Sequence, residues 1–173
     1  MLVSDYIFDF LKDKTDVVYL VVGGQAMYLN DALLRSGIKY ICCHHEQACS
    51  MAADAYSRLS GKLGVALVTA GPGVANVLNG VIGGFMDSSP MMILSGQYNL
   101  NAVDYMKKTG IRQYGIQGIN VEPIVSSFVK YFKTIDDPKK TKQYVQEAYD
   151  QAMTPRRGPV WLDIPLDQQA KNI

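Results

Sequence analysis

The stretch GVALVTAGPGVAN, residues 64–76, decides the fold class of this chain. Its first six residues form a short apolar run, which is typical of a strand that is buried on both faces of a sheet. The run is followed by Gly71-Pro72-Gly73, and a helix is predicted over residues 75–85. A buried strand that leads through a glycine loop into a helix is the building unit of open α/β sheets. The stretch therefore predicts a protein of this class.

The same alternation of strands and helices continues along the whole chain. We expect strands over residues 17–22, 38–43, 64–69, 91–95, 128–135 and 160–164. We expect helices over residues 3–11, 26–36, 46–60 and 75–85, and from residue 138 onward. Residues 98–120 are polar and aperiodic, and they predict a long functional loop. This order predicts a single domain over residues 1–173, built as an open, mostly parallel α/β sheet with helices on both faces.

The loops that follow the predicted strands hold the notable polar and glycine-rich segments. These segments are Gly23-Gly24, residues 44–46, residues 69–76 and Gly96-Gln97. The carboxyl ends of parallel strands meet at one edge of a sheet, and ligands of such sheets bind there. We therefore expect these loops to form one site.

The composition describes an ordinary globular protein, with 48% hydrophobic and 19% charged residues in 173. A formal net charge of +1 gives no electrostatic reason to expect binding to nucleic acid or to an anionic membrane. No apolar run reaches the roughly 20 residues that a membrane span needs. Three cysteines, an odd number, and the lack of an Asn-x-Ser/Thr acceptor favour a cytoplasmic location.

Glu46 stands at the start of a predicted helix, and the segment upstream of it, residues 40–43, is expected to be buried. A carboxylate in a first helical turn is favoured by the helix dipole, so this glutamate could be an ordinary helix-start residue. A carboxyl group in a poorly solvated pocket has a raised pKa and can pass a proton near neutral pH. The small side chains of Ala48 and Ala52 would leave room for a flat ligand beside it.

Other catalytic motifs are weak or missing. The loop at residues 69–76 lacks the Lys-Ser/Thr pair of a phosphate-binding loop and the third glycine of a dinucleotide fingerprint, so by itself it could be a plain tight turn. The run Cys42-Cys43-His44-His45 is not expected to bind a metal, because neighbours on an extended strand point to opposite sides. There is no Gly-x-Ser-x-Gly elbow. Asp163 and Asp167 are expected to be cap or turn residues, and Cys49 a buried thiol.

Two segments together resemble a known family. His45-Glu46-Gln47-Ala48, followed by the loop at residues 69–76, resembles the N-terminal pyrimidine-binding domain of thiamine diphosphate enzymes, in particular the acetolactate synthase group. The string DIPLD at residues 163–167 resembles the exit from that domain. The resemblance implies that Glu46 is catalytic, because the corresponding glutamate activates the cofactor by exchanging a proton with its aminopyrimidine ring.

The resemblance also implies which residues line the pyrimidine pocket. They are Gly24, Thr69, Gly71, Pro72, Gly73, Asn76, Gln97 and Gln117. The chain departs from the family pattern at Val22, where a proline is usual, and at Gly118, where an acid is common. Gln117 could instead be an exposed loop residue.

The implied reaction is the decarboxylation of a 2-keto acid such as pyruvate, with transfer of the hydroxyalkyl unit to an acceptor. The family binds magnesium and the diphosphate through a Gly-Asp-Gly…Asn segment in another domain, and this chain has no such segment. A middle domain, which binds FAD in some members, is also absent, so FAD is possible only in a full enzyme. We therefore expect the isolated chain to be inactive and to need the diphosphate-binding domain of a partner subunit, in a homodimer or homotetramer. The alternatives are a stand-alone binding or regulatory domain and one chain of a split enzyme.

Overall fold

The computed structural model describes all residues from 1 to 173 and contains one six-stranded sheet with the strand order β2-β1-β3-β4-β6-β5. Every neighbouring pair of strands is parallel. The strands are β1 (Val17–Leu20), β2 (Lys39–Cys42), β3 (Gly64–Val68), β4 (Met91–Gln97), β5 (Tyr131–Thr134) and β6 (Pro159–Pro165). The predicted open parallel α/β sheet is confirmed.

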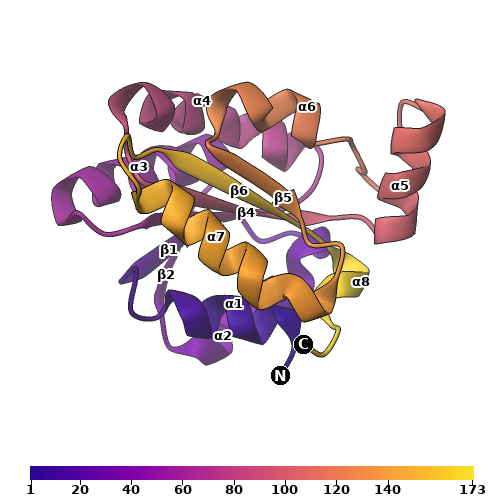
Figure 1. The fold of residues 1–173 in the computed structure, drawn as a ribbon, viewed down its shortest axis with the longest axis horizontal. Coiled ribbons are helices and arrows are strands. Elements are labelled where there is room, and N and C mark those ends of the chain that lie inside the picture. Colours follow the sequence, from indigo (N-terminus) through magenta and orange to yellow (C-terminus); the bar gives the residue numbers. More distant parts are fainter.

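Helices cover both faces of the sheet, as predicted (Figure 1). One layer consists of α1 (Val3–Leu11), α2 (Met27–Ser36) and α7 (Thr141–Met153), and the other of α3 (Glu46–Ser60), α4 (Pro72–Asp87) and α6 (Glu122–Val125). Each layer has its own apolar core, of 24 and 12 buried residues respectively. A short helix, α8 (Leu166–Gln169), follows β6. None of the helices combines the length and apolar character that crossing a bilayer requires.

The expectation of one long loop over residues 98–120 is wrong, because the helix α5 (Leu100–Thr109) forms within it. Its buried stripe consists only of Ala102, Val103 and Met106, so too few apolar residues recur at helical spacing to stand out in the sequence. The true loop, residues 110–121, is half as long. The helix α4 also begins earlier than predicted, at Pro72, because the first helical turn does not need the N–H group that proline lacks.

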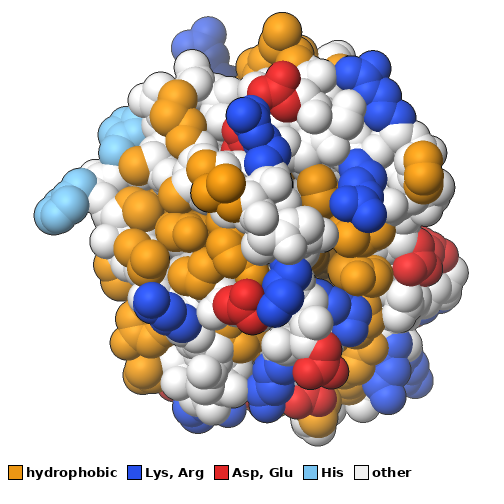
Figure 2. All heavy atoms as spheres, turned by 90° about the vertical axis from the view of Figure 1, so that its left-hand side faces the viewer, with side chains coloured by type: hydrophobic (Ala, Val, Ile, Leu, Met, Phe, Trp, Pro, Cys, Tyr) orange, Lys and Arg blue, Asp and Glu red, His pale blue; other side chains and the backbone are white.

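The expectation that residues 40–43 are buried is wrong as well. The strand β2 lies at the edge of the sheet and all four of its residues are exposed, with Tyr40 at 44% and Ile41 at 41%. Hydrophobic side chains gather on the side of the molecule shown in Figure 2, with the two histidines projecting at its rim. A contiguous apolar area of this kind marks an interaction surface.

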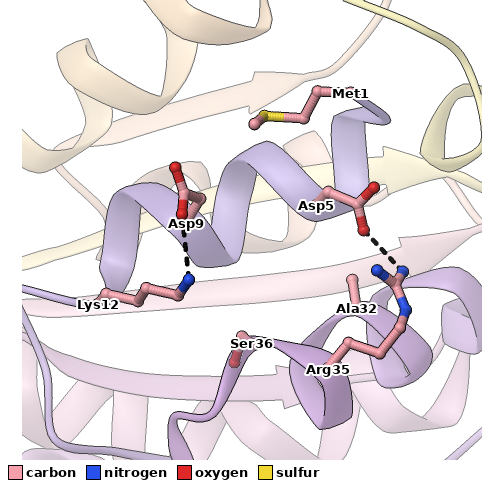
Figure 3. A pocket seen from close by; sticks show the side chains of 7 residues that line it. All are labelled: Met1, Asp5, Asp9, Lys12, Ala32, Arg35 and Ser36. Carbon is pink, nitrogen blue, oxygen red and sulfur yellow. Dashed lines mark hydrogen bonds and ion pairs between the residues drawn. The ribbon is translucent and has the colours of Figure 1, made fainter.

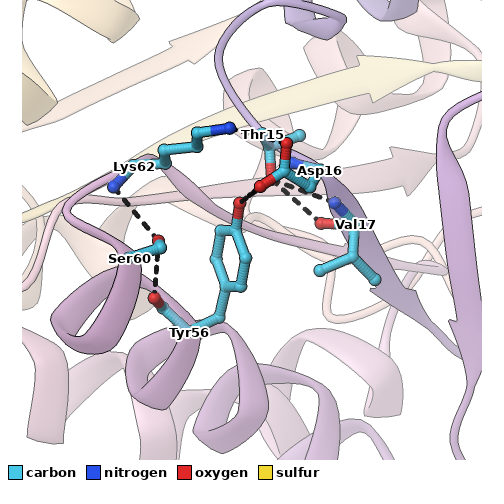
Figure 4. A network of polar contacts seen from close by, with 6 residues as sticks. All are labelled: Thr15, Asp16, Val17, Tyr56, Ser60 and Lys62. Carbon is cyan, nitrogen blue, oxygen red and sulfur yellow. Dashed lines mark hydrogen bonds and ion pairs between the residues drawn. The ribbon is translucent and has the colours of Figure 1, made fainter.

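A polar network ties the end of α3 to the segment before β1 (Figure 4). The Tyr56 hydroxyl donates to Asp16 Oδ2 at 2.8 Å and accepts from the Asp16 backbone N–H at 3.0 Å, while Lys62 Nζ lies 2.6 Å from Asp16 Oδ1. The Asp16 and Lys62 side chains are largely exposed, so each contact stabilises the fold only slightly. The network lies at the end of α3 opposite to Glu46.

Candidate functional site

Glu46 is the first residue of α3, just beyond the carboxyl end of β2. His45 precedes the helix and caps it, because its Nδ1 atom accepts a hydrogen bond from the Gln47 backbone N–H at 3.1 Å. This cap fixes where the helix begins and therefore where Glu46 projects. The Glu46 side chain is half-buried.

The Glu46 carboxylate is held from the neighbouring helix, α4. The Asn76 side chain donates from Nδ2 to Glu46 Oε2 at 2.9 Å. This contact requires α3 and α4 to lie close together, and Gly80 permits it: a Cβ atom at Gly80 would lie only 2.6 Å from the Met51 backbone nitrogen. The structure thus brings together two residues that the family resemblance singled out separately.

Thr69 and the Glu46 carboxylate both lie close to Gly73. The Thr69 Oγ1 atom is buried and has no hydrogen-bond partner in the chain. A Cβ atom added to Gly73 would lie 3.4 Å from both Glu46 Oε1 and Thr69 Cγ2, and one added to Gly23 would overlap the Thr69 side chain. Buried polar groups are nearly always hydrogen-bonded in native proteins, so the Thr69 hydroxyl is one of the exceptions in this chain.

The glycine loop and the loop of residues 110–121 lie against each other. Gly71 has a φ of +65°, which favours glycine, and a Cβ atom there would lie 2.7 Å from the Gln117 carbonyl oxygen. Gln117 itself has a φ of +59° and an exposed side chain. Pro72 opens α4, and Gly24 opens a short 3-10 turn, Gly24–Ala26, with open space around it.

Gln97 lies apart from this group, in the interior. Its side chain is fully buried, and Nε2 donates to the Ile119 carbonyl oxygen at 3.0 Å and to Asp163 Oδ2 at 3.2 Å. Its Oε1 atom accepts from the Tyr98 backbone N–H at 2.9 Å. All these partners belong to the chain itself, so a direct contact between Gln97 and a cofactor stays a prediction.

The expectation that Asp163 is a cap or turn residue is wrong. Asp163 lies within β6 with 1% exposure, and its Oδ1 atom accepts from Ser95 Oγ at 2.6 Å. Asp167 does act as a cap, because it accepts from the first N–H of α5, that of Leu100, at 2.9 Å. A lone acid inside the apolar run VWLDIP is the signal that could have revealed Asp163, since a buried carboxyl group needs partners.

Burial raises the pKa of the Asp163 carboxyl group to about 7, although hydrogen bonds from Ser95 and Gln97 oppose this shift. Because the pKa is raised in the folded state, the stabilisation is complete below the pKa of an unfolded aspartate and is lost as the pH rises to the folded value. We expect the free energy of unfolding, relative to that of Asp163→Asn, to fall between about pH 4 and pH 7. Urea titrations of both proteins across this range measure the difference, and a constant difference would contradict the prediction.

The remaining polar and thiol groups do not extend the site. Cys49 is buried, as predicted, and burial raises the pKa of its thiol. No three His, Cys, Asp or Glu side chains gather where they could hold a metal ion. A polar hollow of about 130 Å³ between α1 and α2 is lined by the ion pairs Lys12–Asp9 and Arg35–Asp5 (Figure 3). It belongs to the helix layer opposite that of α3, so it is separate from Glu46.

The fold and the residues around Glu46 can now be compared with known protein families. The family described as "Thiamine pyrophosphate enzyme, N-terminal TPP binding domain" matches residues 1–124. The chain belongs to this family, and the resemblance noted from the sequence is confirmed.

Curated relatives narrow the class further. The chain is 31% identical over 154 residues to "Acetolactate synthase isozyme 2 large subunit" of Escherichia coli, covering 89% of this chain and 27% of that protein. It is 35% identical over 157 residues to "Probable acetolactate synthase large subunit" of Methanococcus aeolicus, covering 91% and 25%. It is 34% identical over 166 residues to "Acetolactate synthase large subunit" of Haemophilus influenzae, covering 95% and 28%. The chain thus spans about a quarter of the length of these relatives and matches their N-terminal part.

Proposed function

We propose that this chain is the cofactor-activating domain of a larger thiamine diphosphate enzyme of the acetolactate synthase type. The enzyme would decarboxylate a 2-keto acid such as pyruvate and transfer the hydroxyalkyl unit to an acceptor. The observation that carries the proposal is the half-buried Glu46 carboxylate, which Asn76 holds at 2.9 Å next to Gly73 of the glycine loop. Thiamine diphosphate, when bound, supplies the carbanion chemistry that such reactions need.

The residues around Glu46 have the properties that an aminopyrimidine ring requires. Glu46 would hold a proton at its free oxygen and exchange it with a ring nitrogen, and Asn76 would keep the carboxylate in one orientation. A Cβ atom at Gly23 would overlap the Thr69 side chain, so that position needs glycine, whereas the lack of a side chain at Gly73 leaves the Glu46 carboxylate uncovered on that side.

The outer parts of the site would restrict water and orient the ring. We assign this role to Gly24, to the Gly71-Pro72 turn and to Gln117, which rests against that turn. None of these residues carries a charged side chain, so they would define the shape of the site and would not add charge to it. Glu46 is then the only carboxylate of the proposed site that exchanges a proton with the ring.

The diphosphate, magnesium and any FAD would be bound outside residues 1–173. We infer that the diphosphate-binding domain comes from a partner subunit, in a homodimer or homotetramer. The exposed apolar side chains near β2 and α3 and the coverage of about a quarter of the relatives support this inference. A cytoplasmic location fits three cysteines that form no disulfide.

Because this chain would activate the cofactor while another domain binds its diphosphate, we expect different activities for the chain alone and for the complete enzyme. The longest native polypeptide that carries this chain should release carbon dioxide from pyruvate in the presence of thiamine diphosphate and magnesium, while residues 1–173 alone should not. Adding the isolated chain to its native partner subunits tests the split form of the enzyme. Turnover by the isolated chain, or no turnover by any complete assembly supplied with several 2-keto acids, would contradict the proposal.

A further inference from the structure

The loop of residues 110–121 is connected to the centre of the sheet through a buried amide. Gln97, the last residue of β4, donates a hydrogen bond to the Ile119 carbonyl oxygen at 3.0 Å. Two residues before Ile119, Gln117 rests on Gly71, where a Cβ atom would lie 2.7 Å from the Gln117 carbonyl oxygen. The position of Ile119 therefore constrains the position of Gln117.

Gln97 is itself fixed on both sides of its amide. Its Nε2 group faces two oxygen atoms, of Ile119 and Asp163, and its Oε1 atom faces the Tyr98 N–H. Turning the amide over would place a donor against a donor and an acceptor against two acceptors, which is costly in a fully buried place. The amide therefore has one stable orientation.

Asp163 connects Gln97 to further buried side chains. It accepts from Gln97 at 3.2 Å and from Ser95 Oγ at 2.6 Å, and Ser95 in turn accepts from the Trp161 indole N–H at 2.8 Å. From Gln97, the network reaches the Ile119 backbone 22 residues away and the Asp163 side chain 66 residues away, so it joins β4, the loop and β6.

We propose that Gln97 and Asp163 are positioning residues, which hold the loop of residues 110–121 against the Gly71–Gly73 turn and thereby place Gln117 beside the site. The role of that site rests on the proposed function, whereas the connection from Asp163 through Gln97 to the loop does not. Asp163 acts through Gln97, and Gln97 acts through Ile119.

Hydrogen–deuterium exchange of the 173-residue chain, resolved by segment and measured without cofactor, tests the connection. Gln97→Met keeps the volume and removes the hydrogen bonds, so exchange over residues 110–121 should rise about tenfold while β3 and β4 stay protected. Asp163→Asn should raise exchange over the same segment less, because asparagine can keep its side-chain oxygen toward Gln97 and turn its NH2 group toward the Ser95 hydroxyl. The double variant should match Gln97→Met alone, since Asp163 acts through Gln97.

Gln169→Met is the matched control. Gln169 is also fully buried, and its Nε2 atom donates to the carbonyl oxygens of Gln25 at 2.7 Å and Ile164 at 2.8 Å. Loss of the Gln169 amide should raise exchange near residues 23–26 and leave exchange over residues 110–121 unchanged. If Gln97→Met fails to fold, Asp163→Asn carries the same comparison.

Three outcomes would overturn the proposal: unchanged exchange over residues 110–121, a uniform rise over the chain in both Met variants, or additive effects in the double variant. Because no cofactor is present in this experiment, its failure would leave the proposed function standing. Conversely, an inactive complete enzyme would not alter the exchange result.

Discussion

Replacing Glu46 by glutamine is expected to lower the turnover of the complete enzyme by about 10²- to 10⁴-fold, the usual contribution of a positioned acid or base. Glutamine has nearly the same shape and can still accept the hydrogen bond from Asn76, but it cannot hold or release a proton at the ring. The loss should appear in steady-state turnover of pyruvate and in hydrogen–deuterium exchange at the C2 carbon of the bound cofactor.

Glu147→Gln provides the matched control. Glu147 lies on α7, and its carboxylate accepts hydrogen bonds from Tyr131 at 3.0 Å and from Gln143 at 2.8 Å. The chemical change is the same, but the residue lies in the opposite helix layer, so turnover should stay within about twofold of wild type. Equal turnover and equal C2 exchange in wild type and Glu46→Gln would refute the catalytic role of Glu46.

Gly80→Ala and Gly83→Ala are expected to have opposite effects on stability, although they are the same substitution three residues apart on α4. A Cβ atom at Gly80 would lie 2.6 Å from the Met51 nitrogen and 2.7 Å from the Ser50 carbonyl carbon, so α3 and α4 must separate. We expect a loss of about 1–3 kcal/mol in the free energy of unfolding, as for other overpacked positions.

A Cβ atom added to Gly83 would meet no other atom within 4 Å, so alanine there adds only helix propensity. We expect a gain of about 0.5–1 kcal/mol. Urea unfolding of both variants measures these changes. In the complete enzyme, Gly80→Ala should also lower turnover, because separating the two helices pulls Asn76 away from Glu46. A stabilised Gly80→Ala variant would show that the close approach of these helices is not required.

Much of the site was predictable because its signals are local. Glu46 at a helix start and the Gly71-Pro72-Gly73 turn are short motifs, and both lie where the sequence placed them, at the loop ends of parallel strands. The contact between Asn76 and Glu46 joins residues 30 positions apart, and a local sequence pattern does not predict a contact over that separation. The buried network of Gln97 and Asp163 was not predicted for the same reason.

The sequence by itself determined the alternation of strands and helices, the family and the place of Glu46 at a helix start, because periodicity and short motifs act over a few neighbouring residues. Only the tertiary structure decided which strand lies at the edge, and so why the apolar strand β2 is exposed. It also decided that Gln97 is buried beneath the loop of residues 110–121. Strand order and helix packing depend on how all the elements cover the sheet together, so they place residues that are distant in sequence side by side.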